Sequence, residues 1–158
     1  MRQARAEASA IIDAPPDEVY LILADYHNGH PQILPRKYFR ALSIEAGGRG
    51  TGTIIRVRVR VGMVERSYRM LVSEPEPGRV LVEADTESNL TTTFIITPVN
   101  EERQARVQIV TAWETTPGLG GLLEQVLTPP MLRRVYTREL RQLAAVVHSK
   151  GNSRVKKL

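Results

Sequence analysis

The order of the expected elements limits the folds open to this chain more than any single motif does. Residues 7–12 alternate weakly and lead into Asp13 to Glu18, where prolines and acids gather as in the first turn of a helix. Strand patterns then recur from about residue 38 to residue 114, and one long amphipathic helix closes the chain. This order predicts an α+β fold, with a curved antiparallel sheet wrapped around the C-terminal helix and two short helices after the first strand. Because side chains cannot fill the whole interior of such a sheet, we expect a ligand cavity there.

The chain has 158 residues, which suits one domain. We expect this domain to cover residues 1–148 and residues 149–158 to form a basic, disordered tail. No apolar run is long enough to span a bilayer, and residues 1–10 contain no apolar segment, so we expect no secretory signal and a cytoplasmic location. The absence of cysteine excludes disulfides, thiolate nucleophiles and cysteine-ligated zinc.

The net charge of +5 raises the question of a nucleic acid or an anionic membrane as partner. The arginines of residues 56–60 alternate with valines, however, and those of residues 133–141 fall on the polar side of a helix, which is typical of solvated faces. No aromatic residues are interleaved with these charges, so the stacking platforms of single-strand binders are missing. We therefore expect no nucleic-acid partner, and an interaction module that uses the basic surface remains an alternative.

Two alternating segments, residues 53–61 and 64–73, are joined by Gly62 and Met63. Glycine at the first central position suits a two-residue type II′ turn, which predicts a β-hairpin. The glycine-rich residues 47–52 before it lack the Lys-Ser/Thr ending of a phosphate loop, so we interpret them as a turn.

The hairpin register has a specific consequence for the charged residues. Arg60 opposes Glu65, and we expect the two to form an ion pair on the outer face. Val59 opposes Arg66, so Arg66 shares the inner face, where a guanidinium must pair with an acid or with a ligand carboxylate. An arginine near a hairpin tip also extends readily into solvent, and both orientations remain open. The same inner face carries Val57, Tyr68 and Met70.

The next strands are expected over residues 79–85, 90–98 and 106–114, after a turn over residues 74–78. The facing of the first is open: either Val80 and its alternate neighbours lie inside, or Leu81, Glu83 and Asp85 do, and these acids then meet Arg66. In the other two strands the alternate residues that include Phe94 and Trp113 should face the helix. That helix is expected to kink or to restart at residues 128–130, which contain two prolines.

The residues expected to form the cavity wall are apolar, aromatic or hydroxyl-bearing, with His30 and Arg66 as the ionisable members. They are Tyr26, His30, Val57, Val59, Arg66, Tyr68, Met70, Thr92, Phe94, Thr111, Trp113, Met131 and Val135. No catalytic residue is assigned. Asp25, His27 and His30 are too loosely spaced for a metal site, so we predict no metal and no cofactor.

A resemblance to a known family rests on five features. These are the run from Ala14 to Tyr20, the Gly50–Thr53 step into a strand, the Glu74–Pro75 turn, the Thr93–Pro98 strand and the start of the final helix, which is rich in glycine and leucine. Together they resemble the polyketide cyclase/dehydrase branch of the START-like (SRPBCC) superfamily, over residues 6–147. The resemblance implies the helix-grip fold of birch-pollen-allergen-like proteins, with about seven antiparallel strands around the C-terminal helix.

Members of that superfamily include lipid and sterol carriers, aromatic polyketide cyclases and coenzyme-Q-binding proteins, and fold analogy does not choose among them. An apolar cavity with few polar groups favours binding or transport of a hydrophobic or amphipathic small molecule, such as a lipid, a sterol or an aromatic polyketide-like compound. The alternative is a cyclase or dehydratase that uses Arg66, Tyr68 or His30 in acid-base chemistry. The sequence predicts no oligomeric state.

Overall fold

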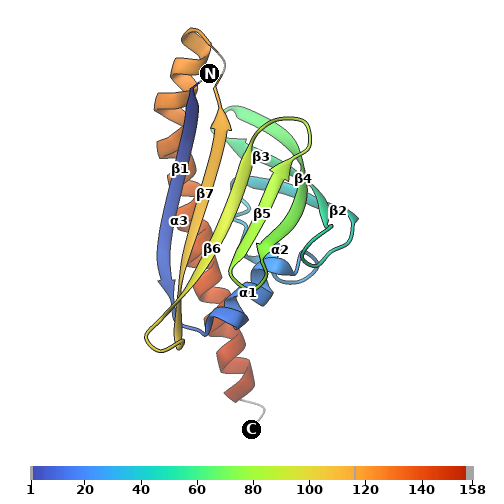
Figure 1. Cartoon of the computed structure of the whole chain (residues 1–158), viewed down its shortest axis with the longest axis vertical. Helices are drawn as coiled ribbons and strands as arrows, with labels where there is room; N and C mark the ends of the chain where they lie inside the picture. Colours follow the sequence, from blue (N-terminus) through green and yellow to red (C-terminus); the bar gives the residue numbers. More distant parts are fainter. Residues whose placement is uncertain (1, 116, 156–158) are drawn as a thin grey trace.

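One antiparallel sheet and one long helix form most of the molecule (Figure 1). The structure, a computed structural model, describes residues 2–115 and 117–155, and within them it leaves out the side chains of residues 119–127 and 153–155. The elements along the chain are β1 (Gln3–Ile12), α1 (Pro16–Ala24), α2 (His30–Ile33), β2 (Phe39–Ala46), β3 (Ile54–Val61), β4 (Val64–Glu76), β5 (Val80–Asp85), β6 (Thr91–Val99), β7 (Gln104–Glu114) and α3 (Leu119–Val155). The α+β class predicted from the order of elements is confirmed.

The strands lie in the order β1-β7-β6-β5-β4-β3-β2, and each pair of neighbours is antiparallel. All consecutive strands are neighbours except β1 and β2, which lie at opposite edges, so α1 and α2 connect the two edges of the sheet. Helix α3 packs along β1 and against α2. In Figure 1 the sheet curves around this helix, which is the helix-grip arrangement that the resemblance implies.

The β3–β4 hairpin has the predicted register, with Val61 opposite Val64 and Val59 opposite Arg66. Gly62 has a φ of 64°, as the first central position of a type II′ turn requires. The expected ion pair between Arg60 and Glu65 is wrong. The Nε of Arg58 lies 3.1 Å from Glu65 Oε1, a diagonal pair on the outer face, while Arg60 Nε donates to the carbonyl of Gly62 at 3.3 Å.

The structure resolves the facing of β5, which the sequence left open. Leu81 and Glu83 are buried, and Val80 and Val82 lie on the opposite side of the strand. The reason lies in the pairing with β6, where Leu81 opposes Phe94 and so must share its face. Glu83 is thereby carried into the interior.

The glycine-rich residues 47–52 form the expected turn. Positive φ values of 66° at Gly47 and 138° at Gly48 require glycine there, and a Cβ on Gly48 would clash with the ring of His27. The turn is followed by β3 and not by a helix, unlike a phosphate loop. β4 runs on to Glu76 with an irregularity after Ser73, so the turn expected over residues 74–78 is shorter than predicted.

Helix α3 continues through Pro129 and Pro130, so the helix does not restart there, one of the two outcomes expected from the prolines. Proline's fixed φ of about −65° is itself helical, and the two missing N–H groups leave only two carbonyls of the preceding turn without partners. The helix also extends past residue 148 to Val155, and residues 156–158 lie outside the described residues. Within the described part of the chain, no helix combines the length and the apolar character needed to cross a bilayer.

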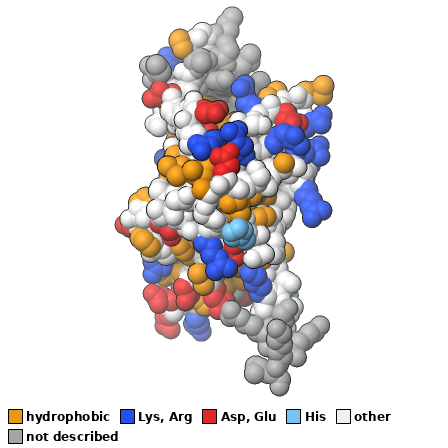
Figure 2. Space-filling model, turned by 90° about the vertical axis from the view of Figure 1, so that its right-hand side faces the viewer, with side chains coloured by type: hydrophobic (Ala, Val, Ile, Leu, Met, Phe, Trp, Pro, Cys, Tyr) orange, Lys and Arg blue, Asp and Glu red, His pale blue; other side chains and the backbone are white. Residues whose placement is uncertain are grey.

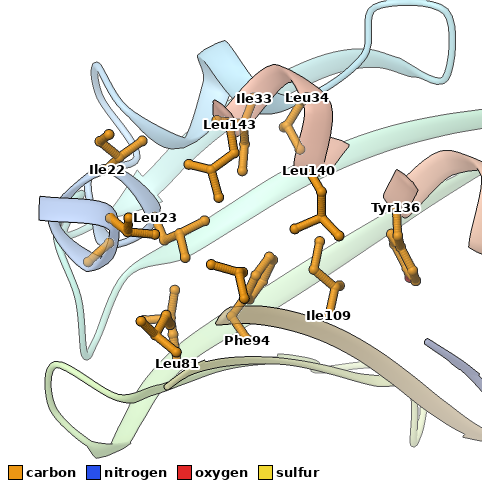
Figure 3. Packing of buried hydrophobic residues seen from close by; sticks show 14 of the residues in the cluster. Ile22, Leu23, Ile33, Leu34, Leu81, Phe94, Ile109, Tyr136, Leu140 and Leu143 are labelled. Atoms are coloured by element: carbon orange, nitrogen blue, oxygen red, sulfur yellow. The ribbon is translucent and has the colours of Figure 1, made fainter. Parts of the chain in front are cut away.

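The hydrophobic core lies between the sheet and the helices. Figure 3 shows Ile22 and Leu23 of α1 and Leu143 of α3 pointing toward a common centre, where Leu81 and Phe94 approach from the sheet. All five are buried. This core closes one end of the space between sheet and α3, and the other end remains hollow.

Candidate functional site

A cavity of about 890 Å³ lies between the inner face of the sheet and α3. Strands β2 to β7, α2 and residues 128–139 of α3 contribute its walls. Its buried lining includes His30, Phe94 and Thr111, whereas Val64 and Met131 are exposed at the outer end, beside the β3–β4 hairpin. The volume falls within the roughly 300–1,000 Å³ of ordinary small-molecule sites.

The structure places all but one of the predicted wall residues around this cavity. Those that line it are His30, Val57, Val59, Arg66, Tyr68, Met70, Thr92, Phe94, Thr111, Trp113, Met131 and Val135. Tyr26 does not line the cavity. It lies behind His30, with the two rings stacked at a centroid distance of 4.6 Å.

Glu83 is the centre of a buried polar cluster at the inner end. Its Oε1 accepts a hydrogen bond of 2.6 Å from the hydroxyl of Tyr26 and lies 3.5 Å from Nε2 of His30. Burial and the neighbouring Glu83 raise the pKa of Tyr26 well above its ordinary value, so its hydroxyl keeps its proton and acts as a donor. The sequence left two orientations of β5 open, and Glu83 faces inward in only one of them.

Neighbouring groups hold the ring of His30 in one orientation. Its Nδ1 donates to the carbonyl of Leu23 at 2.8 Å, and Phe94 packs edge-on against it at 5.4 Å between centroids. With the hydrogen on Nδ1, the second nitrogen and the Glu83 carboxyl have to share a proton, because otherwise two acceptors face each other. Nε2 of His30 and the carboxyl of Glu83 therefore form a buried polar pair at the cavity wall.

Glu139 of α3 brings a second carboxyl to the same end. The residue is only 2% exposed and lines the cavity. Burial, and after it the charge of Glu83, raise the pKa of the Glu139 carboxyl well above its ordinary value. The site thus combines one carboxyl whose burial favours its protonated form with a neighbouring histidine–carboxyl pair.

Hydroxyl groups continue this polar lining along the sheet. Thr92 and Thr111 face each other on β6 and β7 with their oxygens 2.8 Å apart, and Thr111 also bonds the hydroxyl of Tyr136 on α3. Burial raises the pKa of Tyr136 above its ordinary value. The chain links the sheet to the helix and offers a ligand hydroxyl groups that both donate and accept.

Arg66 is exposed and borders the outer end of the cavity. The described residues provide no ion pair for it, so the predicted meeting with the acids of β5 does not occur. Arg66 and Glu83 lie at opposite ends of the site: one is at the mouth, the other inside.

The sequence reasoning missed Glu139 altogether. Val135, Glu139 and Leu143 stand four residues apart and so share one helix face, and both flanking residues are buried. An acid at the centre of an apolar stripe could have indicated that Glu139 is buried. Among the described residues, no three His, Asp or Glu side chains are arranged to hold a metal ion.

Comparisons with known proteins agree with this geometry. Residues 3–148 match the model of a family described as polyketide cyclase/dehydrase and lipid transport. No protein with a curated function matches the chain significantly. Solved structures do match: the KanY protein, determined by NMR, is 25% identical, with a TM-score of 0.81 over 94% of this chain and 99% of that one.

Two further structures share the fold at lower identity. The Zhui aromatase/cyclase from Streptomyces sp. R1128 is 19% identical, with a TM-score of 0.68 over 98% of this chain and 96% of that one. A norcoclaurine synthase of Thalictrum flavum is 16% identical, with a TM-score of 0.72 over 95% of this chain and 97% of that one. With the family model covering nearly the whole chain, and the cavity and fold as described, this protein belongs to the polyketide cyclase/dehydrase and lipid transport family.

Proposed function

We propose that the protein binds a small hydrophobic or amphipathic molecule in the cavity between the sheet and α3. The observation that carries this proposal is the cavity itself, about 890 Å³ of space with largely apolar walls and a polar cluster at its inner end. Such a site holds the apolar body of a ligand by burial and orients it through a few polar groups. Arg66 at the mouth is positioned to contact a polar group that a bound ligand leaves outside.

Binding is tested first by native mass spectrometry of the purified protein and then by titration of Trp113 fluorescence. A fatty acid, a sterol, a flavonoid and an aromatic polyketide serve as probes, and Trp113 reports directly because it lines the cavity and is the only tryptophan. We expect saturable quenching or enhancement by at least one probe. No co-purified ligand and no response to any of them would contradict the proposal.

A matched pair of variants locates the binding. Val59→Phe places a larger side chain in the cavity wall, and we expect it to weaken binding at least tenfold by removing volume. Val82→Phe makes the same change on the opposite face of the sheet and should leave the affinity unchanged. An equal loss of affinity in both variants would mean that the ligand binds outside the cavity.

A second candidate function is a cyclase or dehydratase reaction, and one observation favours it. Burial favours the protonated form of Glu139, and His30 and Glu83 line the same cavity, so a candidate proton donor and a candidate proton acceptor face the same space, which is the pairing that acid-base catalysis needs. In a dehydration, the acceptor would remove a proton next to a carbonyl while the donor protonates the departing hydroxyl.

The test of this candidate is incubation with a β-hydroxy ketone of aromatic polyketide type, followed by mass spectrometry for the loss of one water. Turnover that falls at least about a hundredfold in His30→Gln would support the reaction. Binding of the substrate without any loss of water would leave the protein a carrier.

A further inference from the structure

The cavity is acidic, although the protein as a whole is basic. Among the described residues that line it, the cationic side chains are Arg66 at the mouth and, when protonated, His30. Five carboxylic acids line the same space: Glu65, Glu83, Asp85, Glu114 and Glu139. The net charge of the whole chain is +5, and Figure 2 shows lysine and arginine side chains spread over one outer face among hydrophobic and acidic ones. The acidic residues that border the cavity therefore outnumber the basic ones, the reverse of the balance in the whole chain.

Most of these carboxyls are engaged by neighbours. Glu65 pairs with Arg58 at 3.1 Å, Asp85 accepts the hydroxyl of Ser88 at 2.6 Å, and Glu114 accepts the amide of Asn89 at 2.9 Å. Glu83 is held by Tyr26 and His30, as described above. Glu139 remains as the carboxyl for which the described residues provide no hydrogen bond and no counter-ion.

The Glu139 carboxyl points into the cavity. Every fully buried side-chain nitrogen or oxygen that the structure describes has a hydrogen-bond partner. Since Glu139 has none among the described residues and is still only 2% exposed, its oxygens must hold the small accessible surface of the residue. That surface belongs to the cavity, because Glu139 lines it. A buried acid that faces open space and lacks an internal partner is a group prepared for a ligand.

We propose that the inner end of the cavity binds the protonated amine of an amphipathic ligand, with Glu139 as its direct counter-ion. This inference rests on the proposed function and names the ligand class. An ammonium group donates hydrogen bonds that the ionised carboxylate of Glu139 accepts much more strongly than its neutral form, and the two opposite charges compensate each other in the apolar surroundings. The apolar body of the ligand then extends along the hydrophobic walls toward the mouth.

The groups around Glu139 fit this assignment. Glu83 of β5 adds a second negative charge nearby, and Tyr26 and Tyr136 contribute hydroxyls and no positive charge. His30 of α2 is held by Leu23 and Glu83 and lines the same cavity. Burial favours the protonated form of Glu139 and the ammonium favours its ionised form, so binding of the amine should release the Glu139 proton to the solvent wherever the free protein holds it.

The experiment uses three ligands with one apolar body: 2-(2-naphthyl)ethylamine, 2-(2-naphthyl)ethanol and 2-naphthylacetic acid. Isothermal titration calorimetry at pH 7, in two buffers of different ionisation enthalpy, gives the affinity and the number of protons released. We expect the amine to bind at least about tenfold more tightly than the alcohol and to release protons, whereas the alcohol should release none. The acid should bind more weakly than the alcohol.

Two glutamine variants make the test specific. Glu139→Gln should remove the tenfold advantage of the amine and the proton release while leaving the alcohol's affinity within about threefold. Glu45→Gln makes the same change outside the cavity, where Arg56 and Arg69 already pair with the carboxyl, and should alter none of these values by more than about twofold. If Glu139→Gln does not fold, proton release by the native protein on binding the amine still tests the amine assignment.

The possible failures are distinguishable. If the alcohol binds as tightly as the amine and no proton is released, the amine assignment is wrong while the proposed binding function stands, and Glu139 then acts as a neutral donor. If the acid binds most tightly, Arg66 dominates recognition and the assignment is also wrong. If none of the three ligands binds, neither the assignment nor the proposed function survives for molecules of this size.

Discussion

At the scale of single residues, the interior of this protein contains buried ionisable groups, which a core that serves stability alone would avoid. Glu83 and Glu139 are both buried at the end of a cavity whose other walls are apolar. A buried carboxyl is unfavourable unless it is paired or protonated. Glu83 is stabilised by its neighbours and Glu139 by keeping its proton, so the free energy of folding depends on pH through Glu139.

We predict that Glu139→Gln stabilises the protein at pH 7 by about 1–3 kcal/mol. The unfolded chain loses the Glu139 proton above a pKa of about 4.3, whereas the folded protein retains it because burial raises the pKa. The folded state thus binds more protons, and the wild-type stability falls as pH rises. Urea unfolding followed by Trp113 fluorescence should show the gain shrinking toward zero near pH 4. A variant less stable than wild type at pH 7 would contradict the prediction.

We predict that Tyr26→Phe destabilises the protein by about 1–2 kcal/mol, because Glu83 loses a buried 2.6 Å donor while the ring packing on His30 is kept. The matched control is Tyr38→Phe, since the ring of Tyr38 is half-buried and no hydrogen bond of its hydroxyl is found among the described residues. Denaturant unfolding compares the two variants. Equal effects would mean that the Glu83 hydrogen bond adds no stability.

At the scale of elements, the hairpin β3–β4 shows how local chemistry sets the shape of the cavity mouth. Gly62 fixes the turn, the turn fixes the register, and the register brings Arg66 and Tyr68 onto the face that borders the cavity. A slip of one residue would reverse every side chain of the hairpin. The position of Gly62 is therefore more important than any single contact of the hairpin.

We predict that Gly62→Ala lowers the free energy of unfolding by about 1–2 kcal/mol, because its φ of 64° is unfavourable for an L-residue. An added Cβ would meet only Met131 at 3.9 Å, an ordinary contact, so the loss should come from the backbone alone. Gly151→Ala is the control, since Gly151 lies in α3 with open space around it and should gain about 0.5–1 kcal/mol. Chemical denaturation measures both, and a neutral Gly62→Ala would contradict the turn geometry.

The sequence sufficed for the features that depend on neighbours along the chain. The hairpin register followed from Gly62 and from alternation, and the inward residues of β6 and β7 followed from alternation alone. The facing of β5 could not be predicted, because it depends on which residue of β6 lies opposite Leu81, a contact between separate strands. The same limit applied to the ion pair of Glu65. The twist of the hairpin brings Glu65 to Arg58 and away from Arg60, the residue directly opposite.

The candidate site was predicted only in part. Hydrophobic and aromatic wall residues followed from periodicity, since the inner face of a strand is apolar. Glu139 did not, because an acid on a helix is ordinarily assigned to the solvated face, and only the packing of α3 against the sheet turns it inward. The continuity of α3 through Pro129 and Pro130 was likewise left open, because sequence rules weigh the lost amides and not the compatible φ.

At the scale of the whole molecule, the fold holds a large open space between the sheet and α3. Any ligand that fills this space contacts both, so binding should stabilise the folded state as a unit. We predict that a probe at about 100 times its dissociation constant raises the free energy of unfolding by about 2.7 kcal/mol. Thermal unfolding with and without the probe tests this, and Val59→Phe at the same probe concentration should gain less. An unchanged Tm in a sample shown to bind would mean that the unfolded chain binds the probe equally well.

The central claim is that the cavity between the sheet and α3 is the place where a ligand binds, and methyl NMR tests it most directly. Valine methyl spectra are recorded during titration with 2-(2-naphthyl)ethylamine. The account predicts shift changes at Val57, Val59 and Val135, which line the cavity, and none at Val80 and Val82, on the outer face of β5. Changes confined to the outer valines, with the cavity methyls unmoved by a ligand that binds, would contradict it.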